Sequence, residues 1–194
     1  MPKIRKQNKA DISALLSNDV ALRKYRNQDV ASTVKIPRKS KSTKRKAANE
    51  RFKEANDWAK NILRLPGMKA LYAKGISDKL SNAHTVAVSD YMQAPKIHYI
   101  NLKKHAGAIG DQISIKATDN FQVTTVEVKI TNAKGILLEK GQATRYGRKP
   151  AMWAYLLTVA NPDLPGTVIK VIARDRPGNM VTLEEKIPVE QSAL

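Results

Sequence analysis

The sequence predicts an α+β protein in two parts, a basic helical region followed by a β-sandwich. Apolar residues recur at helical spacing between Thr43 and Pro95, and after Pro95 they alternate with a period of two. The charge is also uneven, since residues 1–60 hold 17 Lys/Arg and 6 Asp/Glu whereas residues 101–194 hold 13 and 9. We therefore expect a basic, largely disordered tail over 1–42, a helical hairpin over 43–95 and a sandwich over 96–194.

The composition narrows the class of protein further. The chain has 194 residues, a net charge of +18 and no cysteine. The lack of cysteine excludes disulfides, thiolate zinc sites and thiol nucleophiles, and it fits a reducing compartment. No apolar run follows the basic start Met1–Lys6, and no stretch approaches the length of a membrane span. We expect a protein without a membrane span that is cytoplasmic, or part of a virion if it is phage-borne.

The tail offers little that could be buried. Ile12, Leu15 and Leu16 could share one face, which predicts at most a weak helix over 11–26. Seven of the twelve residues in 35–46 are basic, and Pro37 disfavours helix before it. Such a segment repels itself, so we expect it to be disordered in isolation.

Two amphipathic helices are expected after the tail. The first begins at an N-cap, Ser42 or Thr43, and ends at 65–67, where Leu-Pro-Gly cannot continue it. Its apolar stripe consists of Ala48, Phe52, Ala55, Ala59 and Ile62. After a short helical turn over 68–74, the second helix begins at an N-cap, Ser77, and stops before Pro95. Its stripe consists of Leu80, Ala83, Ala87 and Tyr91. The two stripes predict an αα-hairpin with a small core around Phe52, Trp58 and Tyr91.

Seven short runs predict the strands of the sandwich. They cover residues 97–102, 112–117, 123–130, 136–143, 152–159, 167–173 and 181–189. Tight turns at 132–135 and 176–179 separate some of them. Seven strands with turns every 8–14 residues are typical of a two-sheet sandwich. Trp153 and Tyr155 point to the same side of one strand and are the best candidates for core anchors.

Several landmarks of this half occur together in a known kind of module. They are the segment 117–123 (ATDNFQV), the Trp153-Ala154-Tyr155 triplet and the turn 173–179 (ARDRPGN). Over about 95 residues the chain resembles bacterial immunoglobulin-like modules, whose strands end in an A-x-D-x-x-G-N turn and which lack the inter-sheet disulfide. The resemblance implies a seven-stranded immunoglobulin-like β-sandwich, a fold that serves adhesion, virion decoration and scaffolding alike.

The first half is similar, more loosely, to the helical part that precedes this module in small basic bacterial proteins of unassigned function. The similarity rests on Phe52, Ala55, Trp58, Ala59, Pro66, Ala70, Tyr72, Asp90 and Pro95. It implies a pair of domains and no particular reaction.

No catalytic or metal-binding constellation is evident. His84, His98 and His105 lack the spacing of metal ligands and read as surface or half-buried imidazoles. Asp119 and Asp175 could collect calcium at one end of the sandwich, or they could cap backbone N–H groups of their own turns. The arginines that flank Asp175 favour the caps. No phosphate-binding glycine loop, G-x-S-x-G motif or isolated carboxylate pair occurs, so we expect no metal, no cofactor and no enzyme.

The basic residues are the best functional signal. The candidate nucleic-acid-binding residues are Lys39, Lys41, Lys44, Arg45, Lys46, Lys53, Lys60 and Arg64. They would bind a DNA or RNA backbone through counterion release, with little sequence choice. The alternative is a solvated helix face, which Glu50, Glu54 and Asp57 favour, and no sequence signature of a known nucleic-acid-binding fold is present.

These signals leave two functional hypotheses open. The first is a binding protein whose basic N-terminal segment engages nucleic acid or another polyanion while the sandwich makes protein contacts. The second is a structural or assembly module, such as a virion decoration or surface-scaffold component. In that case the basic arm would dock on an acidic protein and a sandwich edge would pair with a neighbour's strand.

Overall fold

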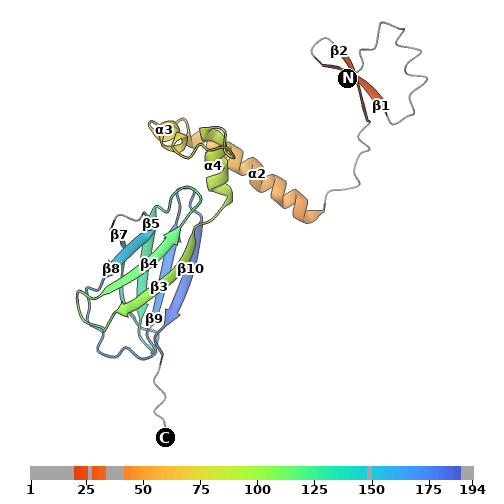
Figure 1. Ribbon diagram of the computed structural model, residues 1–194. Coiled ribbons are helices and arrows are strands. Elements are labelled where there is room, and N and C mark those ends of the chain that lie inside the picture. The colour runs from red at the N-terminus through yellow and green to blue at the C-terminus, as the bar shows by residue number, and fades with distance from the viewer. Residues whose placement is uncertain (1–19, 26–27, 34–41, 148–149, 189–194) are drawn as a thin grey trace. The chain divides into compact units, whose positions relative to one another are not determined.

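The computed structural model describes residues 20–25, 28–33, 42–147 and 150–188 (Figure 1). The chain forms two units that divide after Lys46. In the first unit, β1 (Val20–Tyr25) and β2 (Gln28–Thr33) pair antiparallel, with Val20 opposite Thr33. The helix predicted over 11–26 is therefore wrong for Val20–Tyr25, where Val20 and Leu22 alternate with a period of two. Residues 11–19, and most of the tail predicted to be disordered, lie outside the described residues.

Three helices follow, and the first begins where the sequence predicts. They are α2 (Thr43–Ile62), α3 (Met68–Ala73) and α4 (Ala83–Met92). The carbonyl of Ser42 accepts a hydrogen bond from the N–H of Arg45 at 2.9 Å, and its side chain lies 3.4 Å from the same nitrogen. Ser42 is thus the N-cap of α2. Gly67, with φ of 75°, turns the chain into α3.

The last helix begins later than predicted. Ser77, the expected N-cap, instead forms an isolated β-bridge with Leu80. The N-cap is Asn82, whose side chain accepts from the Thr85 N–H at 2.9 Å while Thr85 Oγ1 accepts from the Asn82 N–H at 3.2 Å. This reciprocal pair satisfies two N–H groups at the helix start. Ser77 has Leu80 three residues later, whose side chain cannot return such a bond, so the pair fixes the start of α4 at Asn82.

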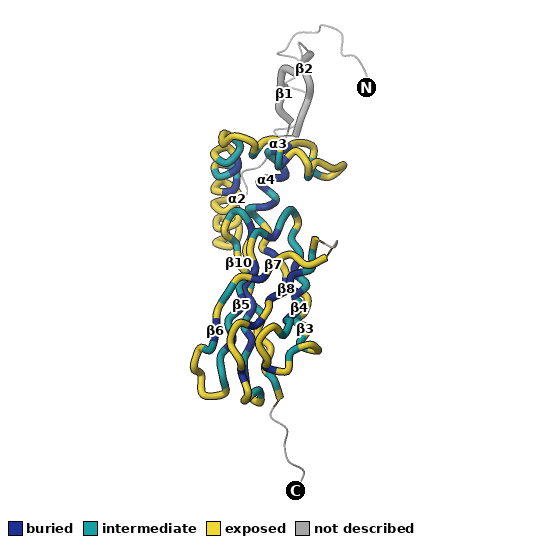
Figure 2. Tube along the Cα trace, turned by 90° about the vertical axis from the view of Figure 1, so that its left-hand side faces the viewer, coloured by how far each residue is buried: buried dark blue, intermediate teal, exposed yellow. Residues whose placement is uncertain are grey.

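The helices share a small core that differs in part from the prediction. Trp58 packs on Tyr91 as expected, with ring centroids 5.7 Å apart. Phe52, however, is 54% exposed, because the first turns of α2 run beyond the cluster, as the exposed colour in Figure 2 shows. Its place is taken by Tyr72, which is fully buried and stacks on Phe121 of the sandwich at 4.5 Å.

Two antiparallel four-stranded sheets form the sandwich. The strands are β3 (Lys96–Lys104), β4 (Gln112–Thr118), β5 (Thr125–Thr131), β6 (Leu137–Gln142), β7 (Thr144–Arg145), β8 (Met152–Leu156), β9 (Val168–Arg174) and β10 (Met180–Lys186). One sheet has the order β10-β9-β5-β6 and the other β3-β4-β8-β7. Each of the seven predicted runs overlaps one of these strands, and the two-residue β7 is an eighth strand that the sequence pattern did not predict.

The core between the sheets follows the predicted alternation. In β5, Val126, Val128 and Ile130 are buried and the residues between them are not. Trp153 and Tyr155, the predicted anchors, are both buried and pair with Ile115 and Ile113 of β4. Burial of these side chains supplies the main apolar stabilisation of the sandwich.

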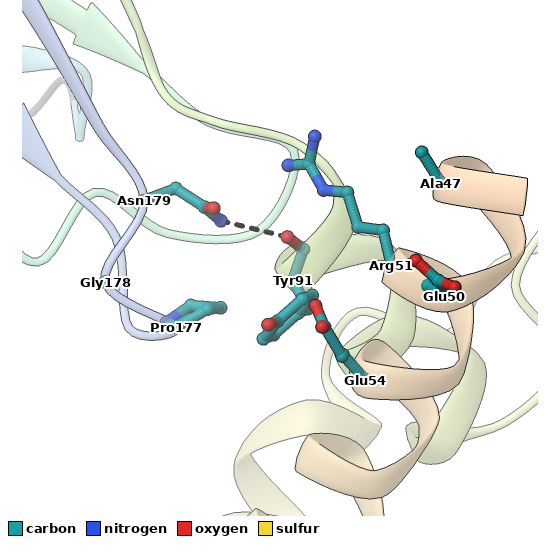
Figure 3. Close-up of a pocket in the computed structure, with 8 residues that line it drawn as sticks. All are labelled: Ala47, Glu50, Arg51, Glu54, Tyr91, Pro177, Gly178 and Asn179. Carbon is teal, nitrogen blue, oxygen red and sulfur yellow. Dashed lines mark hydrogen bonds between the residues drawn. The ribbon is translucent and has the colours of Figure 1, made fainter. Parts of the chain in front are cut away.

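The turn between β9 and β10 ties the helices to the sandwich. Asn179 Nδ2 lies 3.1 Å from the Tyr91 carbonyl (Figure 3) and 3.3 Å from that of Asp90, at the end of α4. Asp175 positions this amide, because its Oδ2 accepts from Asn179 Nδ2 at 2.7 Å and its Oδ1 accepts from the Gly178 N–H at 2.9 Å. The A-x-D-x-x-G-N turn therefore caps the C-terminus of α4.

Replacing Asn179 with alanine is expected to lower the free energy of unfolding by about 1 to 3 kcal/mol, because helix carbonyls and the Asp175 carboxylate would lose their donor. Urea denaturation followed by circular dichroism measures the change. The control is Asn56→Ala, whose exposed amide donates to Phe52 within α2 and should matter little. Equal stability of the two variants would contradict this role of the turn.

Candidate nucleic-acid interface

The structure places six of the eight predicted binding residues, and all six are exposed. Five of them belong to α2, and the sixth lies in the turn that follows it: Lys44, Arg45, Lys46, Lys53, Lys60 and Arg64. Lys39 and Lys41 lie outside the described residues.

Three of these lysines form a line along α2. Lys46, Lys53 and Lys60 are seven residues apart, which is almost two turns, so their side chains leave the same face of the helix. The line is about 21 Å long, at 1.5 Å per residue. Lys44 and Arg45 leave other sides of the first turn. The structure thus supports one basic line and a basic helix start rather than a single continuous stripe.

Three acidic residues of α2 lie beside the lysine line or border a cavity. Lys60 Nζ lies 3.5 Å from Asp57 Oδ1, an exposed pair that contributes little to stability. Glu50 and Glu54 instead line an open cavity of about 350 Å³ (Figure 3). Its lining is completed by Ala47, Arg51, Tyr91, Pro177, Gly178 and Asn179. Glu50 and Glu54 therefore border this cavity, and Asp57 is paired with Lys60. Glu50 is also four residues after Lys46 and three before Lys53, so it lies beside the lysine line and reduces its positive charge.

The two turn aspartates act as caps. Asp119 Oδ2 accepts from the N–H groups of Phe121 at 3.1 Å and Gln122 at 2.9 Å, which confirms the predicted role. Asp175 accepts from the backbone N–H of Gly178 in the same way, and it also accepts from the side-chain amide of Asn179. Within the described ranges, no three His, Asp or Glu side chains are close enough to hold a metal ion.

The three histidines are half-buried or exposed, as the sequence predicts. His84 and His105 are half-buried, and His98 is exposed, with Nε2 2.6 Å from Thr118 Oγ1. Burial lowers the pKa of His105, so its imidazole is neutral near pH 7.

A buried carboxylate at the end of α4 was missed by the sequence analysis. Asp90 is fully buried, its Oδ2 accepts from the Tyr72 hydroxyl at 2.6 Å, and its Oδ1 has no partner among the described residues. Burial raises the pKa of Asp90 to about 7 against the opposing effect of the Tyr72 bond, and the carboxylates of Asp119 and Asp175 raise it further.

A signal for this residue was present in the sequence. Ala83, Val86, Ala87 and Asp90 follow the i, i+3, i+4, i+7 spacing of a buried helix face, so an aspartate occupies an apolar position. The position of Tyr72 opposite it depends on the packing of α3 against α4, which the sequence pattern does not specify.

Comparisons with known proteins give no assignment. No family model matches the chain, and no curated protein does. Among solved structures, the chain is similar to the crystal structure of CopC from Methylosinus trichosporium OB3b, with 14% identity and a TM-score of 0.37 over 52% of this chain and 99% of that one. A likeness of this size bears on neither fold nor function. In the described part of the chain, no helix has the length and apolar character needed to cross a membrane.

Proposed function

We propose that this is a non-enzymatic binding protein whose basic N-terminal segment engages nucleic acid, or another polyanion, without strong sequence specificity. In this proposal an immunoglobulin-like sandwich is available for protein contacts, and the protein acts in the cytoplasm or in a virion. The observation that carries it is the exposed line Lys46, Lys53 and Lys60, which continues the basic start of α2.

Exposed lysines favour the phosphates of a nucleic-acid backbone over anions that need a preformed binding pocket. Lysine ammonium groups on a solvated helix act as point charges, and each phosphate they neutralise releases counterions from a nucleic acid. The six described residues are exposed, so they need no rearrangement to reach a ligand. Nothing along this line reads base edges, which fits binding that depends strongly on salt and weakly on sequence.

The test is a charge reversal with a matched control. Lys44→Glu, Arg45→Glu and Lys46→Glu together are expected to abolish binding to a random duplex and to flatten its dependence on salt. The measurement is fluorescence anisotropy of a labelled duplex across a salt series. The control reverses three exposed lysines outside α2, Lys69, Lys74 and Lys79, and changes the net charge equally. Unchanged binding by the first variant, or equal loss by both, would contradict the proposal.

The structural alternative has one supporting observation. Ile136 and Leu137 are exposed at the start of β6, which is an edge strand of its sheet. An apolar edge can pair with a strand of another chain. In that case the basic arm would dock on an acidic protein, and the mass of the protein in solution would rise with concentration in the absence of nucleic acid.

A further inference from the structure

The outer face of the sheet β3-β4-β8-β7 carries a row of side chains that runs across its strands. Tyr99 of β3 is opposite Lys116 of β4, and Lys116 is opposite Met152 of β8. The N–H of Tyr146, just after β7, donates to the Met152 carbonyl at 2.9 Å. Tyr99, Lys116, Met152 and Tyr146 are therefore neighbours in one row, which has an exposed aromatic ring near each end.

The ring of Tyr99 lies along the sheet rather than standing away from it. Its hydroxyl is 3.7 Å from Met152 Sδ, although β3 and β8 are separated by β4. Strands in a sheet are about 4.8 Å apart, so the side chain has to lean across β4 to reach β8. Tyr99 is 42% exposed and Tyr146 is 51% exposed. Both tyrosine side chains are therefore accessible to solvent.

The next row along the sheet is small and polar. Asn101, Ser114, Ala154 and Thr144 are successive neighbours in it, from β3 across to β7. Because these side chains are short, a flat group resting on a tyrosine ring would meet no bulky neighbour on this side.

The charge of this sheet differs from that of the opposite sheet. None of its four strands contains an aspartate or a glutamate, as their sequences show, whereas Lys96, Lys104 and Lys116 are present. On the opposite sheet three of the four strand lysines are paired with glutamates. Glu127 lies 3.4 Å from Lys129 and 3.3 Å from Lys140, and Lys170 lies 2.7 Å from Glu184. One side of the sandwich is charge-compensated and the other is positive.

We propose that the outer face of β3-β4-β8-β7 binds single-stranded nucleic acid, with bases stacking on Tyr99 and Tyr146 and phosphates meeting Lys96, Lys104 and Lys116. This inference rests on the proposed function and deepens it, since it adds a second surface and a preferred ligand. Stacking requires base faces that a duplex hides and a single strand exposes. An aromatic surface without acidic groups complements the charge of such a strand.

The experiment compares two ligands on the full-length protein, a labelled 12-nucleotide oligothymidylate and a labelled 12-base-pair duplex. Tyr99→Ala with Tyr146→Ala is expected to weaken oligothymidylate binding by about 10-fold or more per ring. The same variant should bind the duplex as the unchanged protein does, because the α2 lysines are intact. Tyr99→Phe with Tyr146→Phe keeps both rings and is expected to bind both ligands normally. Thermal melting of each variant, followed by the fluorescence of Trp58 and Trp153, verifies folding.

The outcomes of this experiment distinguish a failure of this inference from a failure of the proposed function. If the alanine variant binds oligothymidylate as tightly as the unchanged protein, the sheet face is not a binding surface and the role of α2 stands. If the unchanged protein binds neither ligand at low salt, the proposed function is wrong and the inference with it. A dimer that the alanine substitutions dissociate would show that the face contacts a second copy of the chain, which also overturns the inference.

Discussion

Asp90→Asn is expected to make the protein more stable than the unchanged protein above pH 7, and to remove most of its loss of stability between about pH 4 and pH 7. The buried carboxylate already receives a 2.6 Å hydrogen bond from Tyr72, and an asparagine carbonyl can accept the same bond. The amide is neutral at every pH. The substitution therefore removes the cost of holding a negative charge at a fully buried position near the carboxylates of Asp119 and Asp175. Its N–H₂ group can also donate to the neighbouring Asp119 carboxylate.

The sign follows from the two pKa values. Folding raises the pKa of Asp90 from 3.8 to about 7, chiefly by burial. Between these values the folded protein holds a proton that the unfolded chain has released, so stability falls as pH rises. Below pH 3.8 both states are protonated, and above pH 7 both are ionised and the whole penalty is present. The penalty is up to about 4 kcal/mol. Burial also raises the pKa of Asp175, which leaves a smaller slope of the same sign in the variant.

Urea denaturation at pH 5 and pH 8 measures this effect. The unchanged protein should be less stable at pH 8, and Asp90→Asn should nearly close the gap. Asp78→Asn is the matched control, because Asp78 is exposed and its replacement should leave the pH dependence intact. A variant less stable than the unchanged protein at both pH values would show that the carboxylate itself is needed at the junction.

The strands were predictable and the start of the last helix was not, for physical reasons that particular residues show. Strands such as β5 bury every second residue, so the period of the sequence is the period of the structure. The choice between Ser77 and Asn82 as the N-cap depended on whether Thr85 returns a hydrogen bond. Phe52 lies on the apolar stripe of α2, yet it is exposed. Tertiary packing determines which turns of α2 are covered, and the spacing of apolar residues does not predict this.

The candidate site was predictable to a similar extent. Exposure of the α2 lysines follows from charge and helical spacing. The row of Tyr99, Lys116, Met152 and Tyr146 does not, because it depends on the order β3-β4-β8-β7, which brings together residues up to 53 positions apart in sequence. Each tyrosine alone reads as an ordinary strand or turn residue. Only strand register shows that the two rings flank one lysine.

Gly107→Ala is expected to lower the free energy of unfolding of the sandwich by about 3 kcal/mol. Gly107 is buried in the loop between β3 and β4 with φ of +87°, where an alanine is strained. Its carbonyl accepts from the Asn161 N–H at 2.8 Å, which joins this loop to the one between β8 and β9. A methyl group would also lie far inside van der Waals contact of the Asn161 carbonyl oxygen, and backbone cannot give way as a side chain can.

Gly110→Ala separates these two causes. Gly110 has nearly the same φ, +89°, but a methyl group there would meet nothing within 4 Å. It should therefore cost only the conformational strain, about 1 kcal/mol. Urea denaturation of both variants gives the two losses, and their difference measures the contact between the loops. Equal losses would mean that the Asn161 loop moves away at little cost. That outcome would place the rigidity of the sandwich in its sheets, and not in the contact that Gly107 makes between its loops.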